Sequence, residues 1–484
     1  MKSSRYNRFT AADDGVIIAF NAMTGALATL SEEQLSTVDK ILESPDSYEY
    51  SGEEDRSLKE DLMRGGFLLD DSLDELNLLK IRSQMQRFQT TTSSVTIALT
   101  SKCNFRCPYC FEDVANGETA HGEVLEAIAN YVVGKIKGGL QSLNVTWFGG
   151  EPLLYINSLE KLASLFVEQC EEAHCKYSAL IITNGYLLTR AMAERLKAAN
   201  VGSVQITIDG PEELHDKRRF LAGGKGTFRR IIDNIKDCYD ILPIAIRVNV
   251  DNGNAPRMQD FLDELEQQEL KGCVSIYFAP VEEYSDITKD SCGSCMNKST
   301  FSKLQIELER KMMEMGFSMP RNPQPRFTFC TADRSNSVVI GPDGSLYACY
   351  THIGNEREAI GDVWDGSLNH NSVKWLSWSP FDKKLCAECD VLPICMGGCL
   401  VEGFKEPDTQ KGHCEVYKFA LDDHLKLYYD GQKMFGSSEE APPQQVAPSN
   451  GDSIIVGNLK RPARRSPLVQ LRVAGGTPGS DVCT

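Results

Sequence analysis

Two hydrophobic patterns alternate through the middle of the chain. Short apolar runs bounded by turn residues are typical of buried strands. These runs occupy residues 95–99, 145–148, 179–183, 204–208, 245–250 and 274–279. Between the first two runs, Leu125, Ile128, Val132 and Ile136 fall on one helical face. Six β–α units in series predict an α/β fold with a parallel sheet, here a partial (β/α)6 TIM barrel, with ligand sites at the carboxyl ends of its strands.

Residues 1–88 follow a different pattern and contain no cysteine. A strand-like run at 16–20 precedes Ser31 and Gln34, which form a capping box at the start of a helix. A second helix at 58–63 runs into a pair of glycines and a short apolar segment. This order predicts a separate winged-helix-like domain over residues 1–88. A small capping domain without a ligand fits the same pattern.

The charge balance excludes several classes of partner. Lys plus Arg is 51 against 68 for Asp plus Glu, which gives a net charge of −17. Nucleic acids and anionic membranes both require a basic face, so neither is an expected partner. The longest apolar run near the start has only five residues, too few for a signal segment or a membrane span. We therefore expect a soluble cytoplasmic protein.

The 17 cysteines cluster at short spacings, which favours iron–sulfur or zinc ligation over disulfides. In the stretch TSKCNFRCPYCFED, Cys103, Cys107 and Cys110 are separated by three and two residues. Three thiolates can close three corners of a [4Fe-4S] cube and leave the fourth iron open, whereas structural zinc usually takes four ligands. A chance cluster or a partial zinc site is the alternative.

This loop, with Tyr109 directly before its last cysteine, resembles the signature of the radical S-adenosylmethionine (SAM) superfamily. The resemblance implies that the open iron binds SAM. Cleavage of SAM would then give a 5′-deoxyadenosyl radical that abstracts hydrogen from a substrate carbon. Cys103, Cys107 and Cys110 are therefore the candidate catalytic residues, and Tyr109 is a candidate cofactor-binding residue.

Other candidate SAM-binding residues follow the predicted strands. The second strand ends in Gly149, Gly150 and Glu151. Two glycines let the backbone approach a ligand, and a carboxylate accepts hydrogen bonds from ammonium; in the superfamily this element holds the SAM amino group. Asp209, after the fourth strand, is a candidate for the ribose hydroxyls, and Asn184, after the third, for the same pocket. Turn chemistry is the alternative for both.

The segment at 215–228 resembles the stretch after the fourth strand in radical SAM peptide and sulfatase maturases. An arginine there can pair with the SAM carboxylate through two parallel hydrogen bonds. We favour Arg219 over Arg218. The Gly-Lys-Gly-Thr sequence in this segment lacks the spacing of a phosphate-binding loop.

A second group of cysteines resembles the seven-cysteine SPASM domain, which carries two auxiliary [4Fe-4S] clusters. The group consists of Cys330, Cys349, Cys386, Cys389, Cys395, Cys399 and Cys414. By resemblance, the distal cluster is held by Cys386, Cys389, Cys395 and Cys414. The inner cluster is held by Cys330, Cys349 and Cys399, and its fourth ligand is Cys292, Cys295 or absent. A zinc ribbon is the alternative for Cys386, Cys389, Cys395 and Cys399.

These features predict five segments. They are a precursor-peptide recognition domain (1–88), a radical SAM partial barrel (89–285), a bridging segment (286–329), a SPASM domain (330–435) and a disordered tail (436–484). Within the fourth, residues 336–348 predict a β-hairpin around Pro342, Asp343 and Gly344. The tail is rich in Pro, Gln, Ser and Gly.

The resemblance as a whole implies an oxidoreductase that matures a ribosomally made peptide. It would use SAM and three [4Fe-4S] clusters, an electron donor of the flavodoxin or ferredoxin type, and a leader peptide bound by residues 1–88 as an edge strand. Thioether crosslinking is the favoured reaction, and carbon–carbon crosslinking is an alternative. Sulfatase-type oxidation is disfavoured. Sulfatase maturases carry at this position an Asp that acts as a catalytic base, whereas this chain has Tyr350. A non-enzymatic iron–sulfur electron carrier is the alternative from another class.

Overall fold

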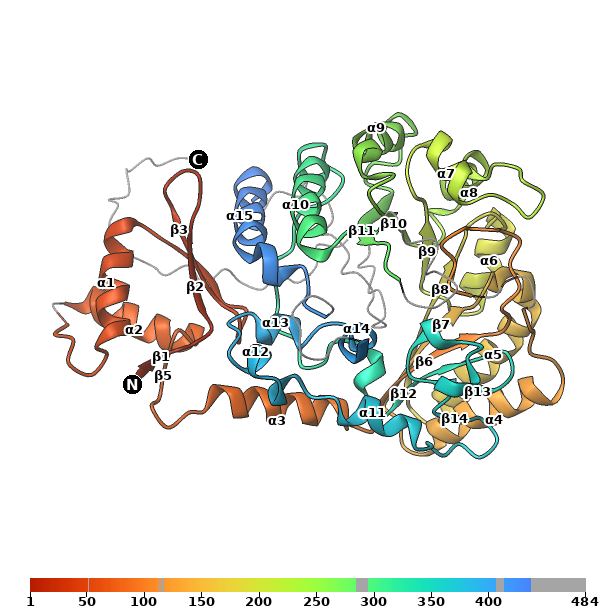
Figure 1. Cartoon of the computed structure of the whole chain (residues 1–484), viewed down its shortest axis with the longest axis horizontal. Coiled ribbons are helices and arrows are strands. Elements are labelled where there is room, and N and C mark those ends of the chain that lie inside the picture. The colour runs from red at the N-terminus through yellow and green to blue at the C-terminus, as the bar shows by residue number, and fades with distance from the viewer. Residues whose placement is uncertain (51, 113, 115–116, 284–294, 406–412, 437–484) are drawn as a thin grey trace, which may run out of the picture.

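The computed structural model describes residues 1–50, 52–112, 114, 117–283, 295–405 and 413–436. Cys292 and the predicted tail from 437 onward lie outside the described residues. Within the described part, no helix is both long and apolar enough to cross a membrane. Figure 1 shows the N-terminal residues at one end of the molecule and the main sheet at the other.

A nine-stranded sheet forms the centre of the fold, in the order β11-β10-β9-β8-β7-β6-β12-β13-β14. Six neighbouring strands are parallel and follow the predicted runs: β6 (Thr92–Ala98), β7 (Ser142–Phe148), β8 (Lys176–Thr183), β9 (Ser203–Thr207), β10 (Ile244–Val250) and β11 (Val274–Pro280). The predicted α/β fold with a parallel sheet is therefore confirmed. The carboxyl ends of these strands share one edge of the sheet, where the cysteine loop begins.

Helices connect successive strands and bury their apolar faces. They are α4 (Glu123–Lys137), α5 (Ile156–Glu172), α6 (Arg190–Ala198), α7 (Glu212–Arg218), α8 (Phe228–Cys238) and α9 (Met258–Gln267). On α4, Ile128, Val132 and Ile136 are buried as their spacing predicts, and Leu125 is half-buried. They join a core that contains Trp147 of β7.

The N-terminal unit contains an antiparallel sheet in the order β2-β3-β4. Its elements are β1 (Lys2–Ser3), β2 (Asn7–Ala11), β3 (Ile17–Asn21), β4 (Leu27–Leu30), α1 (Glu32–Glu43), α2 (Glu53–Gly65), β5 (Leu68–Leu69) and α3 (Glu75–Arg87). The predicted capping box is confirmed, because the Gln34 N–H donates to Ser31 Oγ at 3.2 Å and Ser31 N–H donates to Gln34 Oε1 at 2.8 Å. The sequence pattern missed β2, β4 and α3, which are short or weakly amphipathic.

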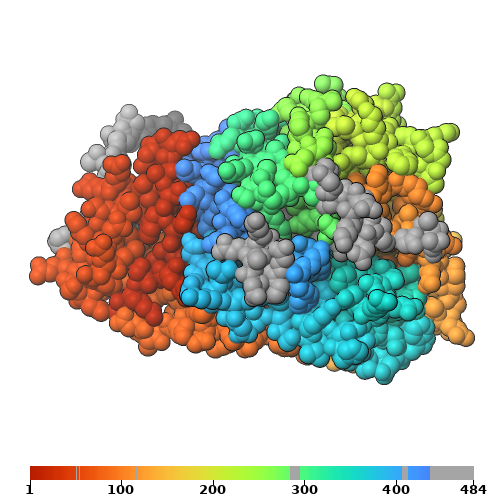
Figure 2. Space-filling view, viewed as in Figure 1, coloured from red at the N-terminus to blue at the C-terminus, as the bar shows by residue number. Residues whose placement is uncertain are grey.

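Strand β3 is buried on both faces because the sheet lies between two cores. Ile17 and Ala19 pack with the residues of α1 and α2, whereas Ile18 and Phe20 join the main core of the chain. Helix α15 (Tyr417–Phe435) contacts β2 and β3, and Figure 2 shows the N-terminal residues against C-terminal ones on the face in view. The N-terminal unit thus shares apolar surface with the rest of the molecule.

The C-terminal third combines two long helices, α10 (Lys298–Glu314) and α15, with short elements around one hairpin. Strands β12 (Ser337–Ile340) and β13 (Ser345–Tyr347) are antiparallel, which confirms the predicted hairpin, and β14 (Gly361–Asp362) follows. Strand β12 also pairs with β6 in parallel. The other helices are α11 (Asn371–Ser377), α12 (Lys384–Ala387), α13 (Leu392–Cys395) and α14 (Leu400–Lys405). The pairing of β12 with β6 holds the C-terminal cysteines beside the main sheet.

Candidate active site and cysteine clusters

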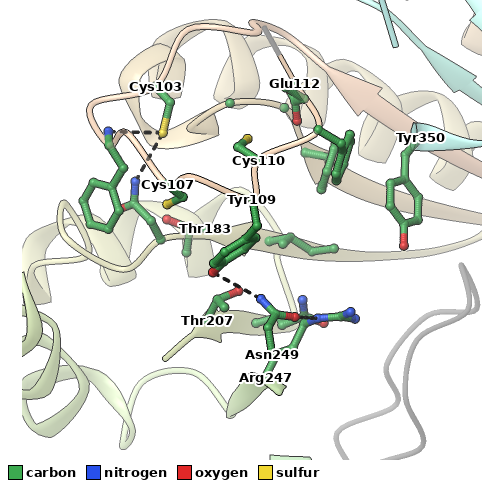
Figure 3. Close-up of a pocket in the computed structure, with 18 of the residues that line it drawn as sticks. Cys103, Cys107, Tyr109, Cys110, Glu112, Thr183, Thr207, Arg247, Asn249 and Tyr350 are labelled. Atoms are coloured by element: carbon green, nitrogen blue, oxygen red, sulfur yellow. Dashed lines mark hydrogen bonds between the residues drawn. The ribbon is translucent and has the colours of Figure 1, made fainter. Parts of the chain in front are cut away.

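The cysteine loop follows β6 and lines a cavity at the carboxyl edge of the sheet (Figure 3). Cys103, Cys107 and Cys110 all border this cavity, together with the backbone of Gly149 and Gly150. We call it the first cavity. The structure thus brings together the three cysteines and the glycine pair that the sequence singled out.

The glycine pair is required by close packing of two backbones. A Cβ on Gly149 would lie 2.2 Å from the carbonyl oxygen of Thr100, and one on Gly150 would lie 2.3 Å from that of Lys102. The Gly150 N–H donates to Thr100 O at 2.8 Å. Gly149 also has a φ of 121°, which disfavours any side chain. Only glycine lets the end of β7 lie this close to the cysteine loop.

The three thiols suit an iron–sulfur cluster better than free cysteine chemistry. Burial raises the pKa of Cys103 and of Cys110 to about 12, and it also raises the pKa of Cys107. Such thiols stay protonated near neutral pH unless a cation stabilises the thiolate, and cluster iron supplies that charge. The Phe105 N–H at 3.4 Å from Cys103 Sγ adds a hydrogen bond of the kind that supports a ligated sulfur.

Glu151 does not occupy the position we expected from the sequence. It is fully buried and is absent from the wall of the first cavity. One carboxylate oxygen accepts from the Leu153 N–H at 3.0 Å and from the Thr183 hydroxyl at 2.7 Å. The other accepts from the Asn184 N–H at 2.8 Å. The side chain therefore ties the end of β7 to the end of β8, and the glycine backbone faces the cavity instead.

Asp209 also differs from the expected ribose contact. It is fully buried behind Tyr109, whose hydroxyl donates to one of its carboxylate oxygens. The other oxygen faces the Asn249 N–H at 3.3 Å. Thr207 and the side chain of Asn249 form the cavity wall here, as Figure 3 shows. Asp209 thus positions Tyr109 and the end of β10.

The two neighbouring arginines have different surroundings. Arg218 Nη1 forms an ion pair with Asp251 Oδ2 at 2.7 Å, and its Nε lies 3.5 Å from Asp209. Arg219 lines the first cavity, and its Nη1 donates to the Tyr109 hydroxyl at 2.6 Å. Within the part of the chain that the structure describes, Arg219 Nε is buried with no hydrogen-bond partner. Arg218 Nη2 is unpaired in the same way, so the two arginines are distinguished by position: Arg219 lines the first cavity and Arg218 does not.

Several cavity residues were missed by the sequence analysis. They are Glu112, Gln205, Thr207, Arg247, Asn249 and Glu282. Gln205 and Thr207 alternate along β9, as Arg247 and Asn249 do along β10, so polar positions with a period of two near strand ends were the available signal. Glu112 carried no such signal. Its burial raises its pKa to about 8, and Oε2 finds no hydrogen-bond partner among the described residues.

A second cavity adjoins the first and is lined by Cys330, Cys349 and Cys399. The two cavities share a wall made of Arg247, Pro280, Glu282 and Tyr350. Tyr350 packs against Phe111 and Phe148, with ring centroids 5.7 Å and 5.4 Å apart. The first and second cavities are therefore neighbours, with these side chains between them.

A third cavity is lined by Cys386, Cys389, Cys395 and Cys414. Cys399 borders the second cavity instead, so the four cysteines of the zinc-ribbon alternative are divided between two places. Across the described ranges, no three His, Cys, Asp or Glu side chains converge closely enough to hold a single metal ion. Cys295 is disulfide-bonded here. The arrangement counts against the zinc ribbon.

Comparison with known proteins agrees with this fold. The radical SAM superfamily pattern matches residues 97–265. GTP 3′,8-cyclase of Alkaliphilus oremlandii is 30% identical over 291 residues, which cover 57% of this chain and 84% of the relative. The protein is an α/β enzyme with a three-cysteine cavity at the carboxyl edge of a parallel sheet. The chain belongs to the radical SAM superfamily, whose members use SAM and a [4Fe-4S] cluster.

Two other relatives match more of the chain. Radical SAM cyclopropyl synthase TigE of Paramaledivibacter caminithermalis is 22% identical over 465 residues, 86% of this chain and 94% of the relative. Cysteine-type anaerobic sulfatase-maturating enzyme of Clostridium novyi is 26% identical over 368 residues, 68% of this chain and 94% of the relative.

Solved structures share the fold at low sequence identity. anSMEcpe with bound AdoMet and Kp18Cys peptide has a TM-score of 0.55 at 18% identity, covering 71% of this chain and 99% of its own. Streptococcus suis SuiB bound to precursor peptide SuiA has a TM-score of 0.51 at 15% identity, covering 86% of this chain and 99% of its own.

Proposed function

We propose that this radical SAM enzyme modifies a ribosomally made precursor peptide, with a thioether between a cysteine sulfur and a carbon as the favoured product. The observation that carries the proposal is the wall shared by the first and second cavities. A peptide side chain in the first cavity would lie within reach of the second set of cysteines. Two structural neighbours were solved with peptides, anSMEcpe with Kp18Cys and SuiB with its precursor peptide SuiA.

In this proposal Cys103, Cys107 and Cys110 hold the SAM-binding cluster, which with SAM supplies the 5′-deoxyadenosyl radical. The backbone of Gly149 and Gly150 faces the methionine part of SAM, and Arg219 Nε donates to its carboxylate. Asn184 lines the first cavity, as expected for a residue of the same pocket. Asn184 keeps the cysteine loop in place through its side-chain hydrogen bond to Asn104 Oδ1 at 2.7 Å.

The ribose hydroxyls would bind to Asn249 and Thr207 rather than to Asp209, because these two side chains form the cavity wall at the ends of β9 and β10. Tyr109, held by Asp209 and Arg219, would form the floor beneath them. The six parallel strands would act as a partial barrel whose open edge admits the substrate.

The other two cysteine sets would hold auxiliary [4Fe-4S] clusters, which makes three clusters in the chain. The four thiols of the third cavity suffice for a closed cube. The second cavity offers three. Its fourth ligand is Cys292, an open position, or Cys295 after reduction of the disulfide in which Cys295 takes part. An open position suits thiol chemistry, because coordination of a substrate sulfur favours its deprotonation. An electron donor of the flavodoxin or ferredoxin type would reduce the SAM-binding cluster.

Residues 1–88 would bind the leader peptide as a winged-helix-like recognition domain. Among the described residues, β4 pairs only with β3. The Asn21 N–H bonds to Ala26 O at 2.9 Å, and Ala19 stands opposite Ala28. Because backbone N–H groups alternate sides along a strand, the N–H of the exposed Thr29 points away from β3. That outer edge is open to an extended peptide.

Two observations count against two of the alternative functions. Tyr350 is a phenol packed against two rings, so the carboxylate base of sulfatase-type oxidation is absent from that position. A pure electron carrier would need neither a cavity beside a three-thiol set nor an arginine in the wall of that cavity. Carbon–carbon crosslinking remains an alternative product of the same site.

The testing experiment is release of 5′-deoxyadenosine from SAM and dithionite by the anaerobically reconstituted full chain. Incubation with short cysteine-containing peptides encoded beside its gene should then give a product 2 Da lighter per thioether formed, because one hydrogen leaves carbon and one leaves sulfur. A protein with full iron content that releases no 5′-deoxyadenosine would instead be an electron carrier.

A further inference from the structure

The third cavity carries two opposite charges beside one of its sulfurs. Lys418 Nζ lies 3.2 Å from Cys389 Sγ, and Asp390 Oδ1 lies 4.0 Å from the same atom. Lys418 and Asp390 are themselves 3.9 Å apart. At another sulfur of the set, His413 Nε2 is 3.9 Å from Cys386 Sγ. Lys418 is thus the cation whose N–H can donate directly to a sulfur of this set.

The same charges connect the cavity to the N-terminal sheet. Arg8 of β2 contacts Asp390 at 3.3 Å and forms two hydrogen bonds of 2.7 Å with Asp422 of α15. Arg5 donates to the carbonyl of Ala387 at 2.6 Å. Figure 1 shows α12 and α13 next to β2, in agreement with these contacts. Asp390 is therefore shared between a cation of the N-terminal unit and Lys418.

Charged neighbours change the reduction potential of an iron–sulfur cluster. This potential depends on net charge, on hydrogen bonds to the sulfurs and on solvent exposure. An ammonium that donates to a ligand sulfur stabilises the more negative, reduced cluster, whereas a carboxylate beside it stabilises the oxidised one. The Lys418 and Asp390 side chains are 29% and 40% exposed, so water screens both charges only in part.

We propose that Lys418 raises the reduction potential of the distal auxiliary cluster, that Asp390 lowers it, and that Arg8 of the N-terminal unit offsets Asp390. This inference rests on the proposed function, since it requires a cluster held by Cys386, Cys389, Cys395 and Cys414.

The experiment is a potentiometric titration of the anaerobically loaded full chain, followed by EPR. The distal signal is the one that Cys414→Ala removes along with about four irons per chain. We expect Lys418→Met to shift its midpoint to lower potential and Asp390→Asn to shift it to higher potential. Arg8→Gln should lower it by less than Lys418→Met, and Lys418→Arg should keep it near the wild-type value.

Opposite signs separate an electrostatic role from structural damage, because a loosened site would not respond in opposite senses to the loss of a cation and of an anion. Lys426→Met is the matched control, since Lys426 lies in the neighbouring polar cavity with Arg8 but does not line the cysteine cavity. Equal midpoints in wild type, Lys418→Met and Asp390→Asn, at equal iron content, would overturn the inference. If Cys414→Ala removes neither iron nor signal, the distal cluster of the proposed function is itself absent.

Discussion

The first and third cavities both collect cysteines, but they are built in different ways. The first lies at the ends of parallel strands and has a volume of about 200 Å³, with three thiols on one side. The third has a volume of about 20 Å³ and is enclosed by four thiols from short helices and loops. Three thiols beside open space leave room for a ligand, whereas four thiols around a small space are enough to complete a cube. In the proposed function, this difference would separate a site for chemistry from a site for electron transfer.

The charged residues around the first and third cavities also differ. In the first cavity, Arg219, Tyr109 and Asp209 form a buried network on the strand ends, and one arginine donor is left for a ligand. In the third, Lys418 reaches a sulfur directly and is partly exposed. A rigid buried network orients a ligand, and a cation at a sulfur adjusts a potential.

The strongest test of this comparison pairs Cys107→Ala with Cys414→Ala. Each variant should lose about four irons per chain. Cys107→Ala should abolish formation of 5′-deoxyadenosine, whereas Cys414→Ala should retain it and lose the crosslinked product. Cys273→Ala is the control, because Cys273 lines none of the three cavities. Wild-type SAM cleavage in Cys107→Ala would contradict the assignment of the first cavity.

A second test concerns how the first cavity is built. Gly150→Ala places a Cβ 2.3 Å from the carbonyl oxygen of Lys102, so the cysteine loop must shift. We expect reduced iron loading and a lower melting temperature. Gly134→Ala in α4 is the matched control, because nothing lies within 4 Å of its added Cβ. This variant should be neutral or stabilised by about 0.5–1 kcal/mol. Equal iron content in the two variants would show that cluster loading does not require the close contact between Gly150 and the cysteine loop.

A third test addresses the free donor of Arg219. A hydrogen bond to a charged group contributes about 1.5–3 kcal/mol, so Arg219→Gln should weaken SAM binding by about 10- to 100-fold. Calorimetry on the reconstituted protein measures this directly. The exposed Arg257→Gln, which removes an ion pair with Asp260, is the control and should bind SAM normally. Unchanged affinity in Arg219→Gln would assign the SAM carboxylate to another residue.

The smallest expected effect is at the N-terminal sheet, which lies beside the third cavity and far along the chain from the first. Thr29→Pro removes an N–H on the outer edge of β4, where proline is tolerated. Precursor binding should weaken by about tenfold, the cost of one or two hydrogen bonds. Thr29→Val keeps the N–H and should bind normally. Deletion of residues 1–88 is a poorer test, because Ile18 and Phe20 belong to the main core.

The sequence alone was enough to predict the features that depend on a local pattern of residues. Apolar runs at a strand period and helical faces at a period near 3.6 predicted the parallel α/β sheet. The spacing of Ser31 and Gln34 predicted a capping box, and a Pro-Asp-Gly turn predicted the hairpin. Each of these is decided by residues close together in the chain, so their physical cause is present in the sequence.

The tertiary structure decided which side chains face a ligand. Glu151 and Asp209 have carboxylates that could bind SAM, and they follow predicted strands in the sequence. In the structure, these carboxylates accept hydrogen bonds from residues at the ends of neighbouring strands. Asn249 faces the cavity because β10 presents alternate residues to it. Lys418 meets Cys389 only because α15 packs beside α13. Such contacts join residues far apart in the chain, and the packing of whole elements determines them.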